Sequence, residues 1–390
     1  MIKRNAQNDI EDELKHSPAI AILGARQVGK TTLAQAIAER MKKKSLYLDM
    51  EDARDESKLA DAGSFLESHK EKCVIIDEVQ RNPSLFATLR PLIDRHRVPG
   101  RFILLGSASP LLIKGVSESL AGRIHYTTLA PVNLAEAAKN NISQNTHWYR
   151  GGFPKALTAS GNNRFHLWMD DYIRSFIEKD MSGIFEMKFP RQIIRNFLNM
   201  LAYNQGGIWN AQLYAGSLGI TGPTVTKYLD YLEGAFIVFR LQPWFMNVEK
   251  RLVRSPKVYI NDSGMLHRFL RISELEQLYG NPIIGQSWEG YVIQQVLQLK
   301  HRDLDAYYYR TQNGAECDIV LVKGLTPLAC IEIKFSNAPV LSRGFYSCIE
   351  DLKTKNNFVI TPESDTYSPK KNIKVCSLRD FFKKQLPEII

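Results

Sequence analysis

Three short apolar runs stand out in the first third of the chain, at residues 19–23, at 73–76 and within 101–106. Runs that are apolar throughout, rather than alternating, are typical of parallel strands covered on both faces. Helix-forming residues follow the first run at 33–41. Strands that alternate with helices predict an α/β fold with a parallel sheet.

The middle third of the chain shows the helical period instead. Aromatic and apolar residues recur at that spacing between Phe165 and Ile177, which predicts an amphipathic helix facing a core. Two shorter helices are predicted at 211–218 and 223–232, followed by strands at 235–241 and 257–260. This order predicts a winged helix, which can bind a DNA groove or serve as a packing module.

The last third returns to strands after one helix. Apolar residues define one helix face from Trp288 to Leu299, and strands are predicted at 305–310, 317–322 and 328–334. Polar or Gly- and Pro-containing seams lie at 140–154 and 280–282. We therefore expect three domains, at 1–147, 148–280 and 281–390.

The connection after the first apolar run has the spacing G-x-x-x-x-G-K-T, which is typical of a phosphate-binding loop. Two glycines allow the backbone N–H groups to surround a phosphate, the lysine reaches the β- and γ-phosphates, and the threonine hydroxyl binds Mg²⁺. The predicted ligands are ATP and Mg²⁺. The residues of this loop are Gly24, Ala25, Arg26, Gln27, Val28, Gly29, Lys30, Thr31 and Thr32.

Two acids end the second apolar run, at the sheet edge where ligands of open α/β sheets bind. We expect Asp77 to hold Mg²⁺ and Glu78 to orient the attacking water. Arg123 follows a predicted short helix at 117–122, where it could reach the γ-phosphate of a neighbouring subunit. A surface salt bridge is the other interpretation of Arg123.

These motifs together resemble one family. The loop 24–32, the run 77–80, and the segments 106–109, 120–123 and 151–154 are similar to prokaryotic AAA+-type ATPases of the archaeal-ATPase group. The resemblance implies a P-loop AAA+-type domain, a helical and winged-helix middle, and a restriction-endonuclease-like α/β end related to PD-(D/E)xK nucleases. It also implies that Ser107 is the polar sensor near the γ-phosphate, although Ser107 could equally belong to an ordinary turn.

A second candidate site lies in the C-terminal third. Asp318 and Glu332 sit on successive predicted strands and could hold Mg²⁺, and Lys334 could stabilise charge or orient water. The pattern is similar to the PD-(D/E)xK motif, and Glu289 matches the accessory helix acid of that fold. An ordinary half-exposed strand with alternating charges is the other interpretation.

The formal net charge of +10 favours polyanionic partners but leaves nucleic-acid binding open. The sequence has no run of about 18 apolar residues, so no membrane span is predicted. No secretory signal is visible at the N-terminus, and five cysteines without a C-x-x-C pair suit buried, reduced thiols. We therefore expect a cytoplasmic protein without structural zinc.

The sequence thus predicts an ATP-hydrolysing homo-oligomer, with a hexamer as one candidate. Two outputs remain open. ATP turnover could drive nucleic-acid binding or cleavage, with DNA favoured over RNA, through the winged helix and the nuclease-like end. Alternatively, the protein is an ATP-driven switch or scaffold whose C-terminal domain is a non-catalytic interaction module.

Overall fold

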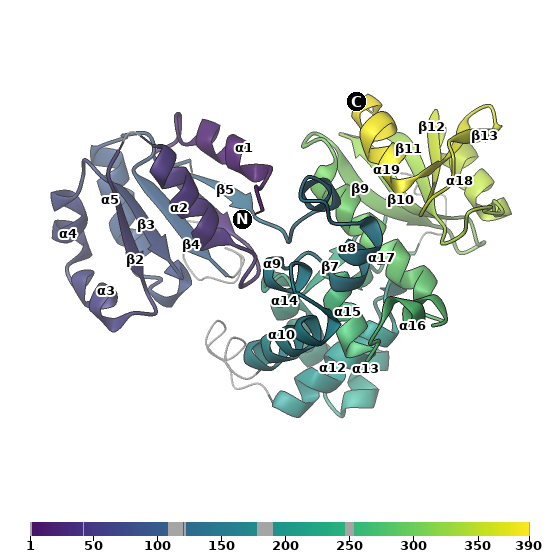
Figure 1. The fold of residues 1–390 in the computed structure, drawn as a ribbon, viewed down its shortest axis with the longest axis horizontal. Helices are drawn as coiled ribbons and strands as arrows, with labels where there is room; N and C mark the ends of the chain where they lie inside the picture. The colour runs from purple at the N-terminus through teal and green to yellow at the C-terminus, as the bar shows by residue number, and fades with distance from the viewer. Residues whose placement is uncertain are drawn as a thin grey trace. The chain divides into compact units, whose positions relative to one another are not determined.

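The computed structural model describes residues 2–41, 43–107, 120, 122–177, 190–245 and 253–389. Figure 1 shows the course of the chain, coloured by residue number. The chain divides into two compact units. The first contains residues 1–147, 152–191 and 227–237, and the second contains 148–151, 192–226 and 238–390. The predicted residues 108, 109, 117–119 and 121 lie outside the described part, and the division into three domains stays a prediction.

The first unit is built on a five-stranded parallel sheet with the strand order β2-β3-β4-β1-β5. This arrangement confirms the predicted α/β fold with a parallel sheet. The strands are β1 (Ala19–Leu23), β2 (Ser45–Asp49), β3 (Cys73–Asp77), β4 (Phe102–Gly106) and β5 (Ile124–Thr128). Every residue of β1, β3 and β4 is buried, which explains why these runs are apolar throughout.

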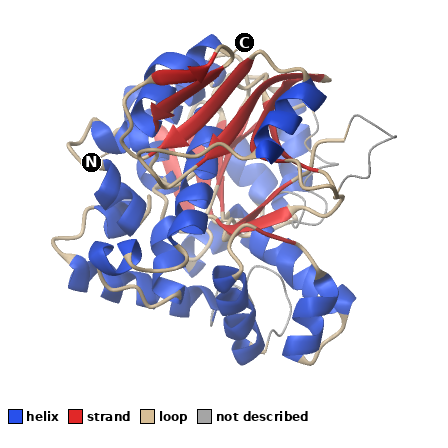
Figure 2. Ribbon diagram, turned by 90° about the vertical axis from the view of Figure 1, so that its right-hand side faces the viewer, coloured by secondary structure: helices blue, strands red, loops and turns tan. Residues whose placement is uncertain are grey.

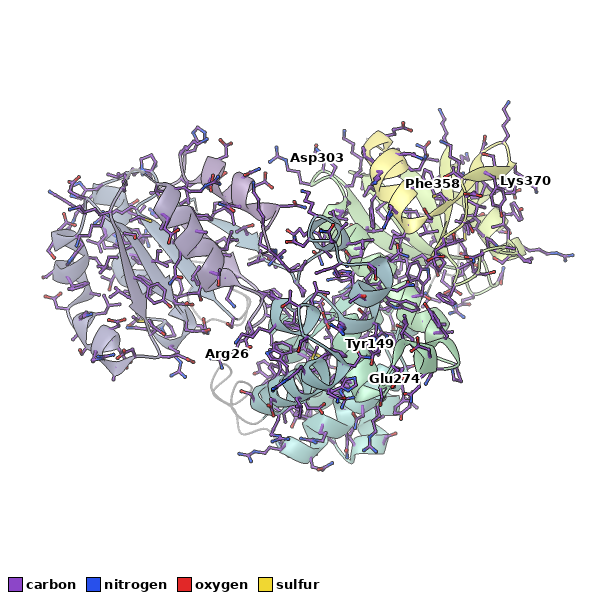
Figure 3. The ribbon with its side chains drawn as sticks, in the orientation of Figure 1. Arg26, Tyr149, Glu274, Asp303, Phe358 and Lys370 are labelled. Carbon is purple, nitrogen blue, oxygen red and sulfur yellow. The ribbon has the colours of Figure 1, made fainter. Side chains whose placement is uncertain are left out.

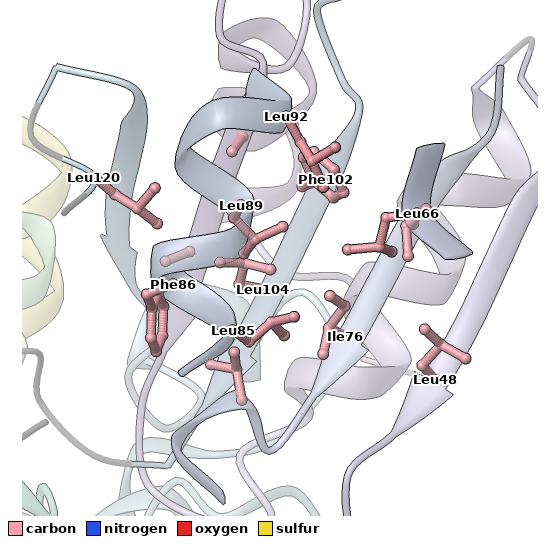
Figure 4. Packing of buried hydrophobic residues seen from close by; sticks show 14 of the residues in the cluster. Leu48, Leu66, Ile76, Leu85, Phe86, Leu89, Leu92, Phe102, Leu104 and Leu120 are labelled. Carbon is pink, nitrogen blue, oxygen red and sulfur yellow. The ribbon is translucent and has the colours of Figure 1, made fainter. Parts of the chain in front are cut away.

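Helices cover this sheet on both faces. On one face, leucines and Phe86 of α5 pack with Ile76, Phe102 and Leu104 of the strands (Figure 4). On the other face, α2 begins at Lys30 and contacts β3 and β4. The helices of this part are α1 (Ala6–Glu13), α2 (Lys30–Arg40), α3 (Ala53–Lys58), α4 (Ala62–Ser68) and α5 (Leu85–Arg95), with a 3₁₀ turn at Val79–Arg81.

Shorter helices follow the sheet along the chain. They are α7 (Leu134–Ala138), α8 (Gln144–Arg150), α9 (Pro154–Leu157) and α10 (Asn162–Ser175). In α10 the buried residues are Phe165, Met169 and Tyr172, which confirms the predicted amphipathic helix. None of the described helices is long and apolar enough to cross a membrane.

A small antiparallel sheet follows in the second unit, with the strand order β6-β8-β7. Its strands are β6 (Gly207–Ile208), β7 (Val238–Leu241) and β8 (Lys257–Ile260). The helices of this stretch of chain are α12 (Arg191–Tyr203), α13 (Ala211–Leu218) and α14 (Gly222–Gly234), and α14 belongs to the first unit from residue 227 on. The first strand of the predicted hairpin begins at Val238 rather than 235. The reason is that α14 runs to Gly234 and Phe236 has a positive φ of 61°, which is turn geometry.

A mixed six-stranded sheet forms the rest of the second unit, in the order β13-β14-β12-β11-β10-β9 (strands drawn in red in Figure 2). Its strands are β9 (Asp305–Arg310), β10 (Glu316–Lys323), β11 (Thr326–Ile333), β12 (Asn356–Thr361), β13 (Tyr367–Lys370) and β14 (Ile373–Ser377). The helices are α15 (Ser263–Phe269), α16 (Leu275–Tyr279), α17 (Ile284–Leu299), α18 (Arg343–Leu352) and α19 (Leu378–Asp380). All five cysteines of the chain are buried and free, as predicted.

Candidate functional site

The predicted phosphate-binding loop connects β1 to α2. A Cβ atom on Gly24 would lie 2.3 Å from the Leu129 carbonyl oxygen, so the loop can pass this point only as glycine. Gly29 precedes the helix with a φ of +98°, a conformation that side chains rarely adopt. The helix therefore starts at Lys30, and its first N–H groups are directed at the space that the loop encloses.

Lys30 is buried, and its ammonium group donates to neutral oxygens. Its Nζ lies 2.8 Å from the Gly24 carbonyl oxygen, 3.0 Å from the Ala25 carbonyl oxygen and 3.0 Å from Ser107 Oγ. Burial lowers the pKa of Lys30 to about 8, against the opposing effect of Glu78 and Asp77. Among the described residues, no carboxylate is recorded in an ion pair with Lys30, so its charge could stabilise an incoming anion.

Asp77 lies at the C-terminal end of β3 and is held by two hydroxyl groups. Thr31 Oγ1 donates to Asp77 Oδ2 at 2.6 Å, and Tyr47 Oη donates to the same oxygen at 2.9 Å. Because β1, β3 and β4 are parallel, their following residues meet at one edge of the sheet. The structure therefore brings Thr31 and Asp77 together.

Glu78 follows Asp77 with a positive φ of 51°. Its Oε1 accepts from Ser107 Oγ at 3.0 Å, and its Oε2 accepts from the amide of Gln80. Ser107 Oγ also accepts a hydrogen bond from Lys30 Nζ, so consecutive hydrogen bonds connect the lysine, the serine and the glutamate. Gln80 also accepts from the Ser107 N–H at 3.4 Å and fixes the exit of β4.

Arg26, labelled in Figure 3, is a loop residue with an ion pair of its own. Its guanidinium donates to Glu51 Oε1 at 2.8 Å, and its Nε lies 4.0 Å from Glu78 Oε1. Arg81 contacts the same Glu51 oxygen at 3.2 Å. Two arginines thus flank the acids of the site.

Arg123 donates hydrogen bonds to Asp94, which is not one of the predicted site residues. Its Nε donates to Asp94 Oδ1 at 2.8 Å, and a terminal nitrogen donates to Asp94 Oδ2 at 2.9 Å. A two-pronged contact of this kind is the strong form of an arginine–carboxylate pair. Within one chain, Arg123 therefore forms the salt bridge that was the alternative interpretation, and its role towards a neighbouring subunit stays a prediction.

A cavity of about 640 Å³ opens beside the loop. Val28, Gly29 and Thr32 line it from the loop side, and Ile2, Arg4 and Gln7 line it from the N-terminal segment. The remaining wall is mostly apolar: Leu33, Asn140, Ile142, Pro154, Lys155, Leu157, Thr158 and Ala159. Its size falls within the range of small-molecule sites.

The N-terminal wall of the cavity is fixed by a buried ion pair. Arg4 donates to Glu136 Oε2 at 3.1 Å and to the carbonyl oxygen of Val28 at 2.9 Å. Glu136 also accepts the backbone N–H of Asn5 at 2.6 Å and that of Asn133 at 3.0 Å. The pair therefore ties the N-terminus to the loop, and breaking it would leave a buried charge without a partner.

The acids predicted in the C-terminal third also come together. Asp318 on β10 and Glu332 on β11 are both buried, and Glu289 on α17 is partly buried. Burial, together with Glu289 and Glu332, raises the pKa of the Asp318 carboxyl well above its ordinary value. The alternative of a half-exposed strand is wrong, because β11 is buried on both faces over its last residues.

Two lysines lie directly on these acids. Lys334 Nζ is 2.7 Å from Glu332 Oε1, and Lys257 Nζ is 3.2 Å from Glu289 Oε1 and 3.8 Å from Asp318 Oδ1. Across the described ranges of the chain, no three or more His, Cys, Asp or Glu side chains are grouped so that they could hold a metal ion. The predicted metal ligands Asp318 and Glu332 thus belong to one cluster, but each of them is paired with the ammonium group of a lysine.

Four residues of these sites were missed from sequence. Tyr47 and Arg4 act through partners 30 and 132 positions away, for which a single sequence carries no signal. Gln80 lies three residues after Asp77 within a motif that was recognised, so its amide could have been considered. Lys257 opens an otherwise apolar strand, and a lysine in that position could have indicated a buried partner.

Family models cover most of the chain. Residues 16–138 match the model described as AAA domain. Residues 142–276 match a domain of unknown function (DUF8612), and residues 284–381 match another domain of unknown function (DUF4143).

Two relatives are similar over about nine tenths of this chain. An uncharacterised protein of Mycobacterium tuberculosis is 37% identical over 360 residues, which cover 92% of this chain and 80% of the relative. An uncharacterised protein of Methanocaldococcus jannaschii is 23% identical over 379 residues, covering 89% of this chain and 82% of the relative.

Solved structures match more distantly. A Walker-type ATPase of Pyrococcus abyssi gives a TM-score of 0.46 at 15% identity, over 69% of this chain and 96% of that one. RuvB of Thermotoga maritima gives 0.34 at 18% identity, over 60% and 88%. Both are too distant to bear on function. The chain belongs to the family of the mycobacterial protein, and its N-terminal part is a nucleotide-binding AAA-type P-loop ATPase domain.

Proposed function

We propose that the protein hydrolyses ATP at the P-loop site. The observation that carries this proposal is the connected arrangement of Lys30, Ser107 and Glu78 beside the Thr31–Asp77 pair. A cation for the phosphates, a carboxylate for the water and a hydroxyl–carboxylate pair for the metal are the parts that phosphoryl transfer requires.

The donor set suits magnesium. Thr31 Oγ1 and Asp77 Oδ2 lie 2.6 Å apart, and a hydroxyl with a carboxylate oxygen is a ligand combination that Mg²⁺ accepts together with phosphate oxygens. These two residues would hold the ion, which neutralises charge on the β- and γ-phosphates when it is bound. Glu78 is the proposed base that orients water, and Ser107 holds its carboxylate in place.

The cavity next to the loop is the proposed site for the base and sugar of the nucleotide. Its apolar wall at Leu33, Ile142 and Leu157 suits a flat aromatic ring, and it adjoins Gly29 and Thr32. A bound nucleotide would then contact both the AAA domain and residues 154–159, which follow it in the chain.

Phosphate release tests the hydrolysis. Glu78→Gln keeps the size of the side chain and removes its basic oxygen, so we expect unchanged binding of fluorescent ATP and a loss of turnover of about a hundredfold or more. Glu71→Gln, an exposed glutamate before β3, is the matched control and should hydrolyse ATP normally. Normal turnover by Glu78→Gln would remove Glu78 from this role.

We also propose that ATP turnover is coupled to nucleic-acid binding through a winged helix. The chain order α12–β6–α13–α14–β7–β8, with the sheet order β6-β8-β7, supports this proposal. In α14, Val225, Leu229 and Leu232 are buried while Lys227 is exposed, as a helix that presents one face to DNA requires.

Fluorescence anisotropy of labelled duplex DNA tests the DNA binding on which this coupling depends. Binding should weaken steeply with salt, and Lys227→Ala should reduce the salt slope by about one. Lys323→Ala, an exposed lysine at the end of β10, is the control and should bind like the wild type. Wild-type DNA affinity in the Lys227 variant would exclude α14 as the DNA-binding helix. Stronger competition by RNA than by DNA would identify RNA as the partner.

The proposed assembly is a homo-oligomer, with a hexamer as one candidate, in which Arg123 reaches the nucleotide of a neighbouring subunit. Arg123 would have to exchange its contact with Asp94 for a phosphate. Mixing Arg123→Ala with Lys30→Ala protein should then recover part of the ATPase activity, because one interface retains both intact partners. A wild-type monomer with full activity at every concentration would contradict this assembly.

The role of the C-terminal part has two candidates. Cleavage of DNA by Asp318, Glu332 and Lys334, with Glu289 as the accessory acid, is supported by the succession of α17 and three antiparallel strands in chain order. A non-catalytic interaction module is favoured by the ammonium group of Lys257 among the acids. Incubation with Mg²⁺ or Mn²⁺, ATP and plasmid DNA distinguishes them, and cutting that Asp318→Ala abolishes would decide for the nuclease.

A further inference from the structure

Four carboxylates of the second unit form one cluster, and three of them lie within ion-pair distance of a buried lysine, Lys257. Glu289 comes from α17, Glu316 and Asp318 from β10, and Glu332 from β11. Lys257 Nζ lies 3.2 Å from Glu289 Oε1, 3.1 Å from Glu316 Oε1 and 3.8 Å from Asp318 Oδ1. Because three carboxylates lie within ion-pair distance of its Nζ, the ammonium form of Lys257 is the central cation of the cluster.

The backbone fixes the position of Lys257. It is the first residue of β8, the central strand of the three-stranded sheet, and it pairs with Ile208 on one side and Leu241 on the other. The segment before it is bonded to β9 as well, because the N–H of Val253 donates to the Arg310 carbonyl oxygen at 3.2 Å. The strand pairing thus fixes where the Lys257 side chain begins, and the ion pairs with the carboxylates hold its Nζ.

The carboxylates also have other donors within the protein. The N–H of Ile333 donates to Asp318 Oδ2 at 2.8 Å, and Tyr259 Oη donates to Glu289 Oε1 at 2.6 Å. Lys334 holds Glu332 at 2.7 Å, and Arg310 lies 3.5 Å from Glu316 Oε2. Four acids thus face three basic groups, Lys257, Lys334 and Arg310, so the cluster is nearly neutral without any added ion.

This donor set does not fit a divalent metal ion. Mg²⁺ needs oxygen ligands at about 2.1 Å in a near-octahedral arrangement and keeps several of its waters. Here an ammonium group with its own hydrogen bonds lies between Glu289, Glu316 and Asp318. A metal ion could enter only if the buried lysine lost its carboxylate partners, which would leave a buried charge uncompensated.

We infer that Lys257 is the built-in cation of this acidic cluster and takes the place that a divalent metal ion would occupy. The ion pairs of this cluster then connect the β7–β8 hairpin to α17 and to the six-stranded sheet. Its chemistry is that of an internal ion-pair network rather than of a metal-dependent nuclease. This inference concerns the second unit alone and holds whether or not the first unit hydrolyses ATP.

Manganese binding tests the inference without relying on any activity. Electron paramagnetic resonance of Mn²⁺ titrated into nucleotide-free wild type and Asp318→Ala measures the ion bound by each protein. Any Mn²⁺ at Thr31 and Asp77 is common to both, so the difference reports the C-terminal cluster only. We expect no difference at millimolar Mn²⁺. A stoichiometric Mn²⁺ site in the wild type that Asp318→Ala loses would overturn the inference.

Removing the lysine should open the site. Lys257→Met keeps the length of the side chain without its charge, so we expect a lower melting temperature and a new Mn²⁺ site that raises it again. Lys323→Met, an exposed lysine at the end of β10, is the matched control and should do neither. A folded Lys257→Met protein that gains no Mn²⁺ would contradict the exclusion of metal by Lys257.

A second variant covers the case in which Lys257→Met does not fold. Lys257→Met/Asp318→Asn removes one negative charge together with the positive one, so it should recover soluble, folded protein by circular dichroism. Failure of this double variant to improve on Lys257→Met would show that charge balance is not what the lysine supplies, and it would overturn the inference.

Discussion

Each of the two units brings lysines and acids together, but the units pair these charges in opposite ways. In the first unit, Lys30 donates to two carbonyl oxygens and to a serine hydroxyl, and its ammonium contacts neither Asp77 nor Glu78 directly. In the second unit, Lys257 and Lys334 lie on the carboxylates themselves. The same residue types therefore yield different chemistry, depending on whether the charges neutralise each other.

This difference in charge pairing explains why the first site can bind a charged ligand more readily than the second. The first site keeps a cation and two acids separate, so each can act on a ligand: the lysine on phosphate, and the acids on metal and water. In the second site, four acids already face three basic groups, so at most one charge is left without a partner in the cluster. A list of residues in sequence motifs does not distinguish the two, whereas the partner of each lysine does.

Removing Lys30 should have the largest effect of the changes proposed here, and the effect should be on ATP turnover. Lys30→Ala takes away the one cation of the first site that is held on neutral oxygens, so we expect ATP turnover to fall by about a hundredfold or more, with weaker ATP binding. Phosphate release and fluorescent-ATP titration measure both. Lys44→Ala, an exposed lysine before β2, should behave as wild type, and wild-type ATP affinity in Lys30→Ala would remove the contrast.

The corresponding change in the second unit should affect stability instead. Asp318→Ala leaves the buried Ile333 N–H without its acceptor, which should lower the free energy of unfolding by about 2 kcal/mol, whereas Lys257 keeps its two nearer partners. ATP turnover should not change. Denaturant unfolding measures the loss, and Asp303→Ala, an exposed aspartate labelled in Figure 3, is the control. Unaltered stability would mean that the network contributes little.

The low pKa of Lys30 gives the first site a pH signature. With a pKa of about 8, the lysine loses its proton above that pH, while a bound phosphate would raise the pKa and restore the proton. ATP binding should therefore take up a proton at about pH 9 and none at about pH 6.5, and the affinity should fall by up to about tenfold per pH unit above 8. Calorimetry in buffers of different ionisation enthalpy measures the uptake, which Lys30→Ala should lack at both pH values.

The smallest expected effect concerns Tyr47. Tyr47→Phe keeps the ring and removes the hydrogen bond to Asp77 Oδ2, which should cost about 1 kcal/mol in metal binding. The Mg²⁺ concentration needed for half-maximal ATPase activity should therefore rise by about fivefold, while the maximal rate stays nearly unchanged. An unchanged Mg²⁺ requirement would show that Thr31 alone is sufficient to hold Asp77 in position.

Much of the fold could be predicted because its signals are local. The apolar runs that became β1, β3 and β4 are covered on both faces, and the helical spacing around Phe165 belongs to one buried helix face. The P-loop was equally local, since its spacing lies within nine residues between one strand and one helix. The boundary at Val238 was missed because a positive φ at Phe236, a residue whose type does not favour it, ended the turn.

By itself, the sequence determined the phosphate-binding loop, the two acids where β3 ends, and the placement of Asp318 and Glu332 on successive strands. Only the tertiary structure decided which charges meet. Lys257 is 61 residues from Asp318 in the chain, and Tyr47 is 30 from Asp77, yet each pair is in contact or close to it. The reason is physical: a strand sets which way its own side chains alternate, but the pairing and packing of distant strands decide which ion each side chain finds beside it.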